Sequence, residues 1–167
     1  IDSSMNRIIG YCPETMSKGE KESRLGNFVA DLLLKKANFL YNGKVDISLM
    51  NNGGLRAPIN KGNIRVSDVF ELMPFDNELA IVTLDGKTTW KIFEFLAREK
   101  KSSIGNSKVL IIKDTLNQLF IDGKPFDVNK SYTIATSDYI ANGGDSMEFM
   151  KDALKVSFPR IKIRDII

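Results

Sequence analysis

Hydrophobic residues change their spacing several times along this chain, from the helical period to the strand period and back. Residues 22–40, ESRLGNFVADLLLKKANFL, place apolar side chains three and four positions apart, which predicts a helix that stops before Gly43. Residues 45–50, VDISLM, alternate apolar and polar side chains, which predicts a strand. Because such segments alternate throughout the 167 residues, with hairpin pieces between them, we expect an α+β fold: an α/β-type mixed sheet with flanking helices. The length suits one domain over residues 1–167.

The sequence also indicates the apolar face of the first predicted helix and the positions of further elements. The predicted helix at residues 22–40 presents one apolar face, made of Leu25, Phe28, Val29, Leu32, Leu33 and Leu40. Further strands are predicted at residues 7–11, 78–84, 108–113, 118–122, 131–137 and 160–167, with a tight turn at 122–123. A second helix is predicted to begin at the cap Ser67 and to end before Pro74. A third is predicted at residues 88–100, with Thr88 or Thr89 as its cap, and a fourth at residues 145–154.

Composition excludes several classes of function. Hydrophobic residues make up 43% of the chain, which is enough for a packed core, and no apolar run approaches the roughly 18 residues of a membrane span. The net charge of +3 arises from charges of both signs mixed along the chain, so no basic stripe of the kind that nucleic acid requires is present. Cys12 is the single cysteine and cannot form an internal disulfide.

The absence of histidine narrows the possible chemistry further. Hydrolytic zinc sites and most dinuclear metal sites use imidazole, and Ser–His and Cys–His nucleophile pairs require it. Sites made only of carboxylates remain possible. Because the sequence has no histidine, we assign no catalytic residue and no metal ligand. The chain begins at Ile1 with neither Met nor a secretory signal, so we expect a processed precursor or a trimmed chain.

Two Asn-Gly-Gly elbows stand out, NNGGLRAPI at residues 51–59 (the first elbow) and ANGGDSM at residues 141–147 (the second elbow). Each follows a predicted strand, and loops beyond strand ends are where α/β architectures usually hold ligands. Their glycines, Gly53, Gly54, Gly143 and Gly144, permit positive φ and a close backbone approach. We expect the elbows to converge on one face. The simpler interpretation of either one alone is a favoured Asn-Gly turn.

Each elbow carries a charge, and two aromatic residues stand nearby. Arg56 can bind phosphate or carboxylate through two hydrogen bonds, or it forms a surface salt bridge. Asp145 can accept from the vicinal hydroxyls of a sugar; the simpler interpretation is an N-cap of the helix predicted to follow, a role compatible with the first. We expect both to line a common cleft. Phe75 and Tyr139 lie next to polar turns, where two rings can hold a base between them; otherwise they belong to the core.

Three blocks of the sequence together resemble the C-terminal domain of 5'-nucleotidases and UDP-sugar hydrolases. They are ESRLGNFVADLLL, residues 51–86 around the first elbow, and residues 131–150 around the second elbow, in the family's order and spacing. The likeness extends from about Gly10 onward. It implies a domain that binds the nucleoside part of the substrate, while a separate N-terminal metallophosphoesterase domain, absent from this chain, holds two divalent metal ions.

The resemblance also implies a role for each residue that matches a family motif. Asn51 falls on a residue that contacts the base or sugar, Arg56 on an arginine facing the substrate, and Asp145 on the acid that binds the ribose hydroxyls. Phe75 and Tyr139 fall on the two stacking aromatics, the second usually Phe. The implied substrate-binding residues are Asn51, Arg56, Phe75, Asn77, Tyr139 and Asp145.

The chain departs from the family pattern at three places. An arginine frequent in the family is Gly19 here, with Lys18 and Lys21 beside it, and lysine offers a point charge in place of a bidentate fork. Asn52 replaces a glycine. Tyr139 carries a hydroxyl that must find a partner or water. These differences bear more on phosphate recognition than on nucleoside recognition.

The resemblance therefore predicts a nucleoside- or nucleotide-binding domain of a 5'-nucleotidase-type hydrolase, inactive as this chain alone and without a cofactor of its own. Its expected partners are a nucleoside, nucleotide or nucleotide sugar, and a metallophosphoesterase domain in the same protein or on another chain. A periplasmic, extracellular or cell-surface location is implied. Two alternatives stay open: a stand-alone nucleotide or nucleotide-sugar binding protein, and a degenerate domain used for protein contacts.

Overall fold

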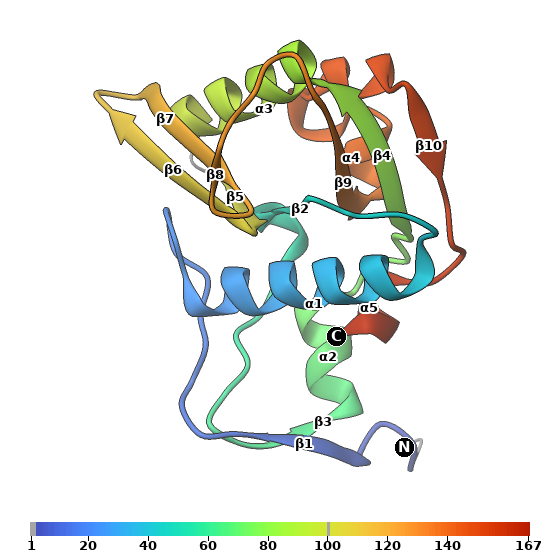
Figure 1. Ribbon diagram of the computed structural model, residues 1–167. Helices are drawn as coiled ribbons and strands as arrows, with labels where there is room; N and C mark the ends of the chain where they lie inside the picture. The colour runs from blue at the N-terminus through green and yellow to red at the C-terminus, as the bar shows by residue number, and fades with distance from the viewer. Residues whose placement is uncertain (1–2, 100) are drawn as a thin grey trace.

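A five-stranded mixed sheet lies between two helices in the computed structural model, which describes residues 3–99 and 101–167 (Figure 1). The helices are α1 (Arg24–Leu40) on one face and α3 (Gly86–Glu99) on the other. The strand order is β10 (Lys155–Ser157), β4 (Leu79–Asp85), β9 (Ser131–Ser137), β2 (Ile47–Asn51) and β5 (Ser102–Gly105). The α+β fold with a mixed sheet and flanking helices is confirmed.

The direction of the three central strands decides which loops meet. β2 and β9 are parallel, with Ile47 opposite Ile134, so their carboxyl ends lie at the same edge of the sheet. β4 runs antiparallel to β9 and pairs Leu79 with Ser137, so the segment that enters β4 reaches that edge too. The loops after β2 and β9 and the loop before β4 therefore share one edge.

The hydrophobic core is divided into two layers by the sheet. On the α3 side, Ile47 and Leu49 of β2 pack with Phe93, which is 1% exposed. On the α1 side, Met50 of β2 packs with residues of α1. Ser48 points to this second layer, is fully buried, and donates its hydroxyl to the carbonyl of Ala30 over 2.6 Å. Ile47 and Leu49 share one face as the strand period predicts, but both faces of this central strand are covered. Val45, predicted on the same face, precedes β2 and packs in the layer on the α1 side.

Helix α1 agrees with its prediction except at one end of its apolar face. Ser23 is the N-cap, and its hydroxyl accepts from the Gly26 N–H. Leu25, Val29 and Leu33 are fully buried. Leu40, which was placed on the buried face, is 41% exposed because the helix passes beyond the edge of the second core layer there.

Two predicted helix caps are wrong, for the same reason. α2 (Val66–Leu72) begins directly after β3 (Gly62–Arg65), so Ser67 lies inside its first turn, and Asp68 accepts from the Arg65 N–H over 2.7 Å. α3 likewise begins directly after β4, and Asp85 accepts from the Thr88 N–H over 2.7 Å. In both helices a strand leads into the first turn, and an acidic side chain caps it.

The two last predicted elements are also wrong. Residues 145–154 form two short 3-10 turns, Gly144–Ser146 and Glu148–Asp152, because Asp145 and Ser146 adopt positive φ angles of 52° and 64° that an α-helix cannot contain. Residues 160–167 end in a short helix, α5 (Ile163–Ile166), and contribute only a single bridge, Lys162 to Glu78. The strand that pairs with β4 on the side away from β9 is β10, which the sequence patterns did not reveal.

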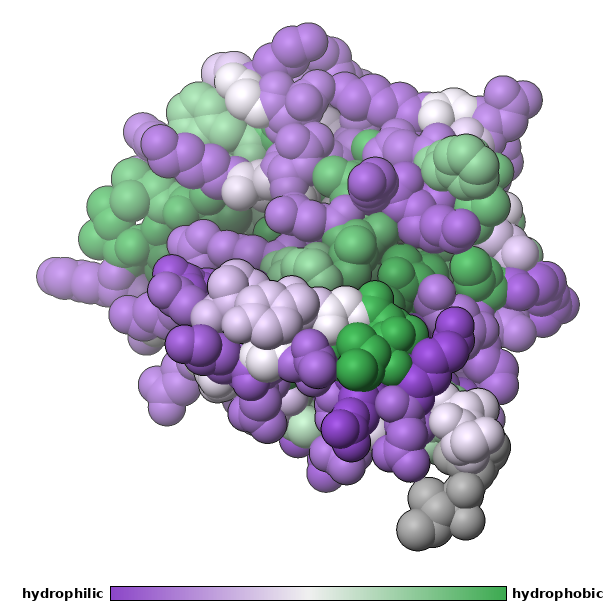
Figure 2. Space-filling model, turned by 90° about the horizontal axis from the view of Figure 1, so that it is seen from below, coloured by the Kyte–Doolittle hydropathy of each residue, from purple (hydrophilic) through white to green (hydrophobic). Residues whose placement is uncertain are grey.

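Two smaller sheets complete the fold. β6 (Ser107–Ile112), β7 (Thr115–Ile121) and β8 (Lys124–Pro125) form one, and the predicted tight turn joins β7 to β8 with positive φ at both Asp122 and Gly123. β1 (Ile8–Cys12) pairs with β3 in the other. Figure 2 looks onto this second sheet and shows apolar side chains among polar ones; Ile8, Ile9 and Tyr11 of β1 are 54%, 45% and 64% exposed. Within the described residues, no helix has the length and apolar character to cross a membrane.

Candidate functional site

Three loops meet at the edge of the sheet where β2 and β9 end. The first elbow continues β2 as a 3-10 turn, Asn52–Gly54. The second elbow follows β9 after one short helix, α4 (Asp138–Ala141). The third loop, residues 73–77, lies between α2 and β4 and carries Phe75 and Asn77. All six candidate binding residues belong to these three loops or to the ends of the elements that flank them.

Asp145 joins the two elbows. Its carboxylate accepts from the Asn51 side-chain amide over 2.7 Å and from the Tyr139 hydroxyl over 2.9 Å. The Tyr139 oxygen in turn accepts from the backbone N–H of Asp145 over 3.2 Å. Asp145 is therefore held in its left-handed conformation by side chains, and the interpretation of this residue as a helix N-cap is wrong. A carboxylate has about four acceptor positions, so it can still accept from a ligand.

The ring of Tyr139 lies against the second elbow. A Cβ added to Gly144 would stand 2.5 Å from the Tyr139 Cε1 atom, so the ring rests on the bare glycine backbone. Tyr139 is nevertheless 46% exposed, so part of the side chain is accessible. Only Gly143 of the four elbow glycines has a positive φ, 90°. At Gly54 and Gly144 the glycine provides room instead, because a Cβ at Gly54 would stand 2.4 Å from the end of Met50.

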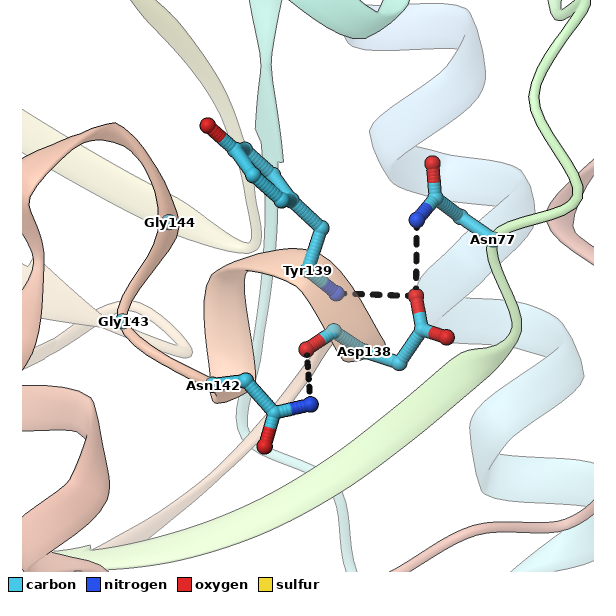
Figure 3. Close-up of a pocket in the computed structure, with 6 residues that line it drawn as sticks. All are labelled: Asn77, Asp138, Tyr139, Asn142, Gly143 and Gly144. Atoms are coloured by element: carbon cyan, nitrogen blue, oxygen red, sulfur yellow. Dashed lines mark hydrogen bonds between the residues drawn. The ribbon is translucent and has the colours of Figure 1, made fainter.

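A hollow of about 390 Å³ opens beside Tyr139 (Figure 3), and Asp138 organises its polar wall. One carboxylate oxygen of Asp138 accepts from the Asn77 side chain over 2.9 Å and from the Tyr139 N–H over 2.8 Å. The Asn142 side chain donates to the Asp138 carbonyl over 2.8 Å. Sequence reasoning did not single out Asp138. Its position as an acidic residue directly after the strand and the N-cap Ser137 was the available signal.

Phe75 and Arg56 lie together at this edge. Phe75 is 41% exposed, and the Arg56 guanidinium carbon lies 6.0 Å from the centre of its ring. Within residues 3–99 and 101–167, Arg56 forms no ion pair, so its guanidinium is available to an anion. No hydrogen bond or ion pair joins Arg56 to Asp145 in that part of the chain; the common cleft for these two residues remains a prediction.

Two of the departures from the family pattern contact each other. The Asn52 side chain donates to the carbonyl of Gly19 over 3.1 Å, and its oxygen accepts from the Ser103 hydroxyl over 3.1 Å. The lead-in segment is thereby attached to the first elbow. Lys21 lines a different and larger hollow, of about 770 Å³, between the start of α1, the end of α3 and the β6 strand. No candidate binding residue lines that hollow.

The chemistry available at this edge is recognition by polar and aromatic groups. Two accessible rings offer faces to a planar ligand, and Asp145 offers a fixed carboxylate to paired hydroxyl groups. Arg56 offers a cation to an acidic group. Among the residues that the structure describes, no group of three or more His, Cys, Asp or Glu side chains could hold a metal ion.

The fold and this edge define an α+β domain whose polar candidate site is built from three loops. Residues 8–152 match the family described as "5'-nucleotidase, C-terminal domain", and the chain belongs to that family.

Similar proteins agree with this assignment. The chain is 29% identical to the trifunctional nucleotide phosphoesterase protein YfkN of Bacillus subtilis, over 92% of this chain and 12% of that protein. It is 32% identical to Protein UshA of Yersinia enterocolitica, over 60% of this chain and 19% of that protein. The crystal structure of a 5'-nucleotidase precursor from Thermus thermophilus shares the fold, with a TM-score of 0.86 at 24% identity.

The chain is much shorter than these proteins. The aligned part covers 36% of the Thermus structure and 98% of this chain. This chain therefore corresponds to one segment of each of these longer proteins.

Proposed function

We propose that this chain is the nucleoside- or nucleotide-binding domain of a 5'-nucleotidase-type phosphohydrolase. The bond between Asn51 and Asp145 carries the proposal, because it joins the two elbows at the place where Tyr139 exposes one ring face. Asp145 would accept the ribose hydroxyls, and Asn51 would hold the carboxylate in place. Family membership of residues 8–152 supports the same assignment.

The base would lie between Phe75 and Tyr139. Both side chains are more than two-fifths exposed, which is unusual for large aromatics that belong to a core. In the described chain, ring–ring contacts join Trp90 to Phe126, Phe95 to Phe149, and Phe126 to Tyr132. Neither Phe75 nor Tyr139 takes part in such a contact, so no other aromatic ring of the described chain stacks on them. Arg56, beside Phe75, is placed to meet the phosphate or another acidic part of the ligand.

Replacement of Phe75 by alanine tests the stacking role. We expect the affinity for adenosine to fall by about five- to 150-fold, since one lost stack costs about 1–3 kcal/mol in comparable sites. The measurement is calorimetric titration of adenosine, AMP and UDP-glucose into the wild-type and variant chains. Phe39→Ala is the matched control, because Phe39 is 81% exposed on α1, away from the three loops. Equal binding by wild type and Phe75→Ala would contradict the proposal.

Hydrolysis would require residues that this chain does not supply. The family resemblance implies two divalent metal ions, and the donor set here does not fit them: the sequence has no histidine, and the described residues contain no carboxylate or cysteine cluster that could serve instead. We therefore place the metal site in a metallophosphoesterase domain, either in the same protein or on a separate chain. A periplasmic or cell-surface location goes with this assignment.

The chain alone should release no phosphate from AMP and should not cleave UDP-glucose, with or without added manganese or zinc. The physical reason is the missing imidazole donors, without which a metal-bound hydroxide cannot be held near the phosphate. Product formation by the purified chain, measured against buffer, checks this. Activity that stays with the protein through a second, different purification step would show that the chain carries its own catalytic site.

A further inference from the structure

The loop that carries Phe75, residues 73–77, has no helix or strand of its own to hold it. Pro74 lies in it and has no N–H to donate, so this segment cannot join the sheet by an ordinary ladder. The carbonyl groups on both sides of Pro74 need donors from elsewhere. A stacking ring on an unsupported loop would lose conformational entropy on binding, which weakens affinity.

Arg164 supplies those donors from the other end of the chain. Its Nη1 atom lies 3.3 Å from the carbonyl oxygen of Met73 and 3.3 Å from that of Phe75. Its Nη2 atom donates to the Asp76 carboxylate over 2.8 Å. One guanidinium group thus contacts three residues of the Phe75 loop through two different nitrogens of its planar fork, whereas a lysine ammonium offers its donors from a single nitrogen.

The guanidinium is itself fixed in place. The Arg164 side chain is only 10% exposed, and its guanidinium carbon lies 4.1 Å from the centre of the Phe70 ring in α2. Ile163, the preceding residue, is fully buried, and its N–H donates to the Asn77 carbonyl over 2.9 Å. The C-terminal segment is therefore attached to the Phe75 loop by its backbone as well as by its side chain.

Asp76 strengthens the attachment from the solvent side. Its carboxylate also accepts from the Lys162 ammonium over 2.9 Å. Hydrogen bonds first from Lys162 and then from Arg164 hold the pKa of Asp76 below its ordinary value, so it is ionised at neutral pH.

Arg164 combines three hydrogen bonds to the Phe75 loop with one donor that has no partner among the described residues. The Arg164 Nε atom is buried and has no hydrogen-bond partner in the described structure. An unpaired buried donor costs about 1–3 kcal/mol, whereas an apolar side chain over Phe70 would leave the Met73 and Phe75 carbonyls without the donors that Arg164 supplies. The contacts of Arg164 converge on the loop that presents Phe75, and Arg164 lies outside residues 8–152, the part that matches the family.

We propose that Arg164 is a positioning residue for ligand binding: it fixes the Phe75 loop so that the Phe75 ring is oriented before the base arrives. This inference rests on the proposed function, in which Phe75 stacks on the base. Arg164 acts through the loop backbone and does not touch the ligand.

A double-mutant cycle between Arg164 and Phe75 tests the proposal. Arg164→Met keeps an unbranched apolar stem over Phe70 and removes every donor. We expect it to weaken adenosine binding by about two- to thirtyfold, the range seen when a residue acts on a site without touching the ligand. In the Phe75→Ala background the same substitution should change the affinity by less than about twofold, because the ring it positions is gone. Arg164→Lys, which retains the ion pair with Asp76, should give an intermediate loss.

Arg160→Met is the matched control in the same segment. The Arg160 side chain is 79% exposed, and it forms an ion pair with Glu78 over 3.4 Å. This variant should bind adenosine as the wild type does. If Arg164→Met does not fold, as judged by circular dichroism, Arg164→Lys takes its place in the cycle. Its loss in adenosine affinity should likewise disappear in the Phe75→Ala background.

The outcomes separate this inference from the proposed function. If the Arg164 variants bind adenosine as tightly as wild type while Phe75→Ala binds weakly, Arg164 has no positioning role and the binding function stands. If Arg164→Met lowers the affinity for adenosine equally with and without the Phe75 ring, Arg164 acts on the fold generally, which also overturns the inference. If Phe75→Ala binds as well as wild type, or wild type binds no ligand, the proposed function itself fails.

Discussion

Gly144→Ala should leave the fold intact and largely remove nucleoside binding. The new Cβ would stand 2.5 Å from Cε1, 2.6 Å from Cζ and 2.7 Å from Cδ1 of the Tyr139 ring, so the ring has to move. Because the ring is 46% exposed, it can swing outward into solvent at little cost in stability. The displaced hydroxyl would then no longer reach Asp145.

The expected loss in affinity for adenosine is at least the roughly five- to 150-fold of one stacking contact. The ordering of Asp145 by the Tyr139 hydroxyl is lost in addition. The preference for adenosine over its 2',3'-dideoxy analogue should therefore shrink as well. Titration of both compounds measures the effect, and thermal unfolding checks that the variant is folded.

A double-mutant cycle between Gly144 and Tyr139 shows whether Gly144→Ala weakens binding by displacing the Tyr139 ring. In a Tyr139→Ala background the clash is absent, so adding Gly144→Ala should weaken binding no further. Undiminished binding by the single variant Gly144→Ala would mean that the ring adopts its binding position independently of the second elbow. The proposed arrangement of Tyr139 and Asp145 would then be wrong.

Gly86→Ala should be among the most destabilising single substitutions in the chain. Gly86 is the buried first residue of α3, and a Cβ there would stand 2.2 Å from the Val128 carbonyl oxygen and 2.8 Å from that of Lys130. These are backbone atoms, which cannot rotate away as a side chain can. The helical preference of alanine over glycine, about 1 kcal/mol, opposes the clash but does not offset it.

We expect the free energy of unfolding to fall by about 3 kcal/mol, the upper part of the range for overpacked sites. Chemical denaturation followed by circular dichroism measures it. Gly10→Ala is the control, because its Cβ would meet only the end of Ile64 at 3.7 Å, an ordinary contact. If Gly86→Ala is as stable as wild type, the segment at residues 128–130 does not pack on the start of α3 as described.

The sequence by itself determined the fold class, most elements and the family. Those features depend on local patterns: α1 carries a clear helical period, and β4 and β9 are seven-residue segments rich in apolar and β-branched side chains. The two elbows were recognisable because Asn-Gly-Gly is a local turn signal. Residue type also indicated the chemistry that Arg56, Phe75, Tyr139 and Asp145 can provide, since that chemistry belongs to the side chain itself.

Short segments misled the sequence analysis where long-range contacts decide the conformation. Residues 160–167 have the composition of a strand, but β10 occupies the place beside β4 and this segment folds into α5 against α1. Asp145 resembles a helix cap in sequence. Its bonds to Asn51 and Tyr139 hold it in a left-handed conformation instead.

Only the tertiary structure decided which residues meet. Asn51 and Asp145 are 94 positions apart, and they are joined because β2 and β9 are parallel neighbours that end at the same edge of the sheet. Arg164 contacts the Phe75 loop from 89 positions away because the chain returns to that edge at its end. No local period encodes strand direction or the return path of the chain, since both depend on how all the elements bury their apolar faces together.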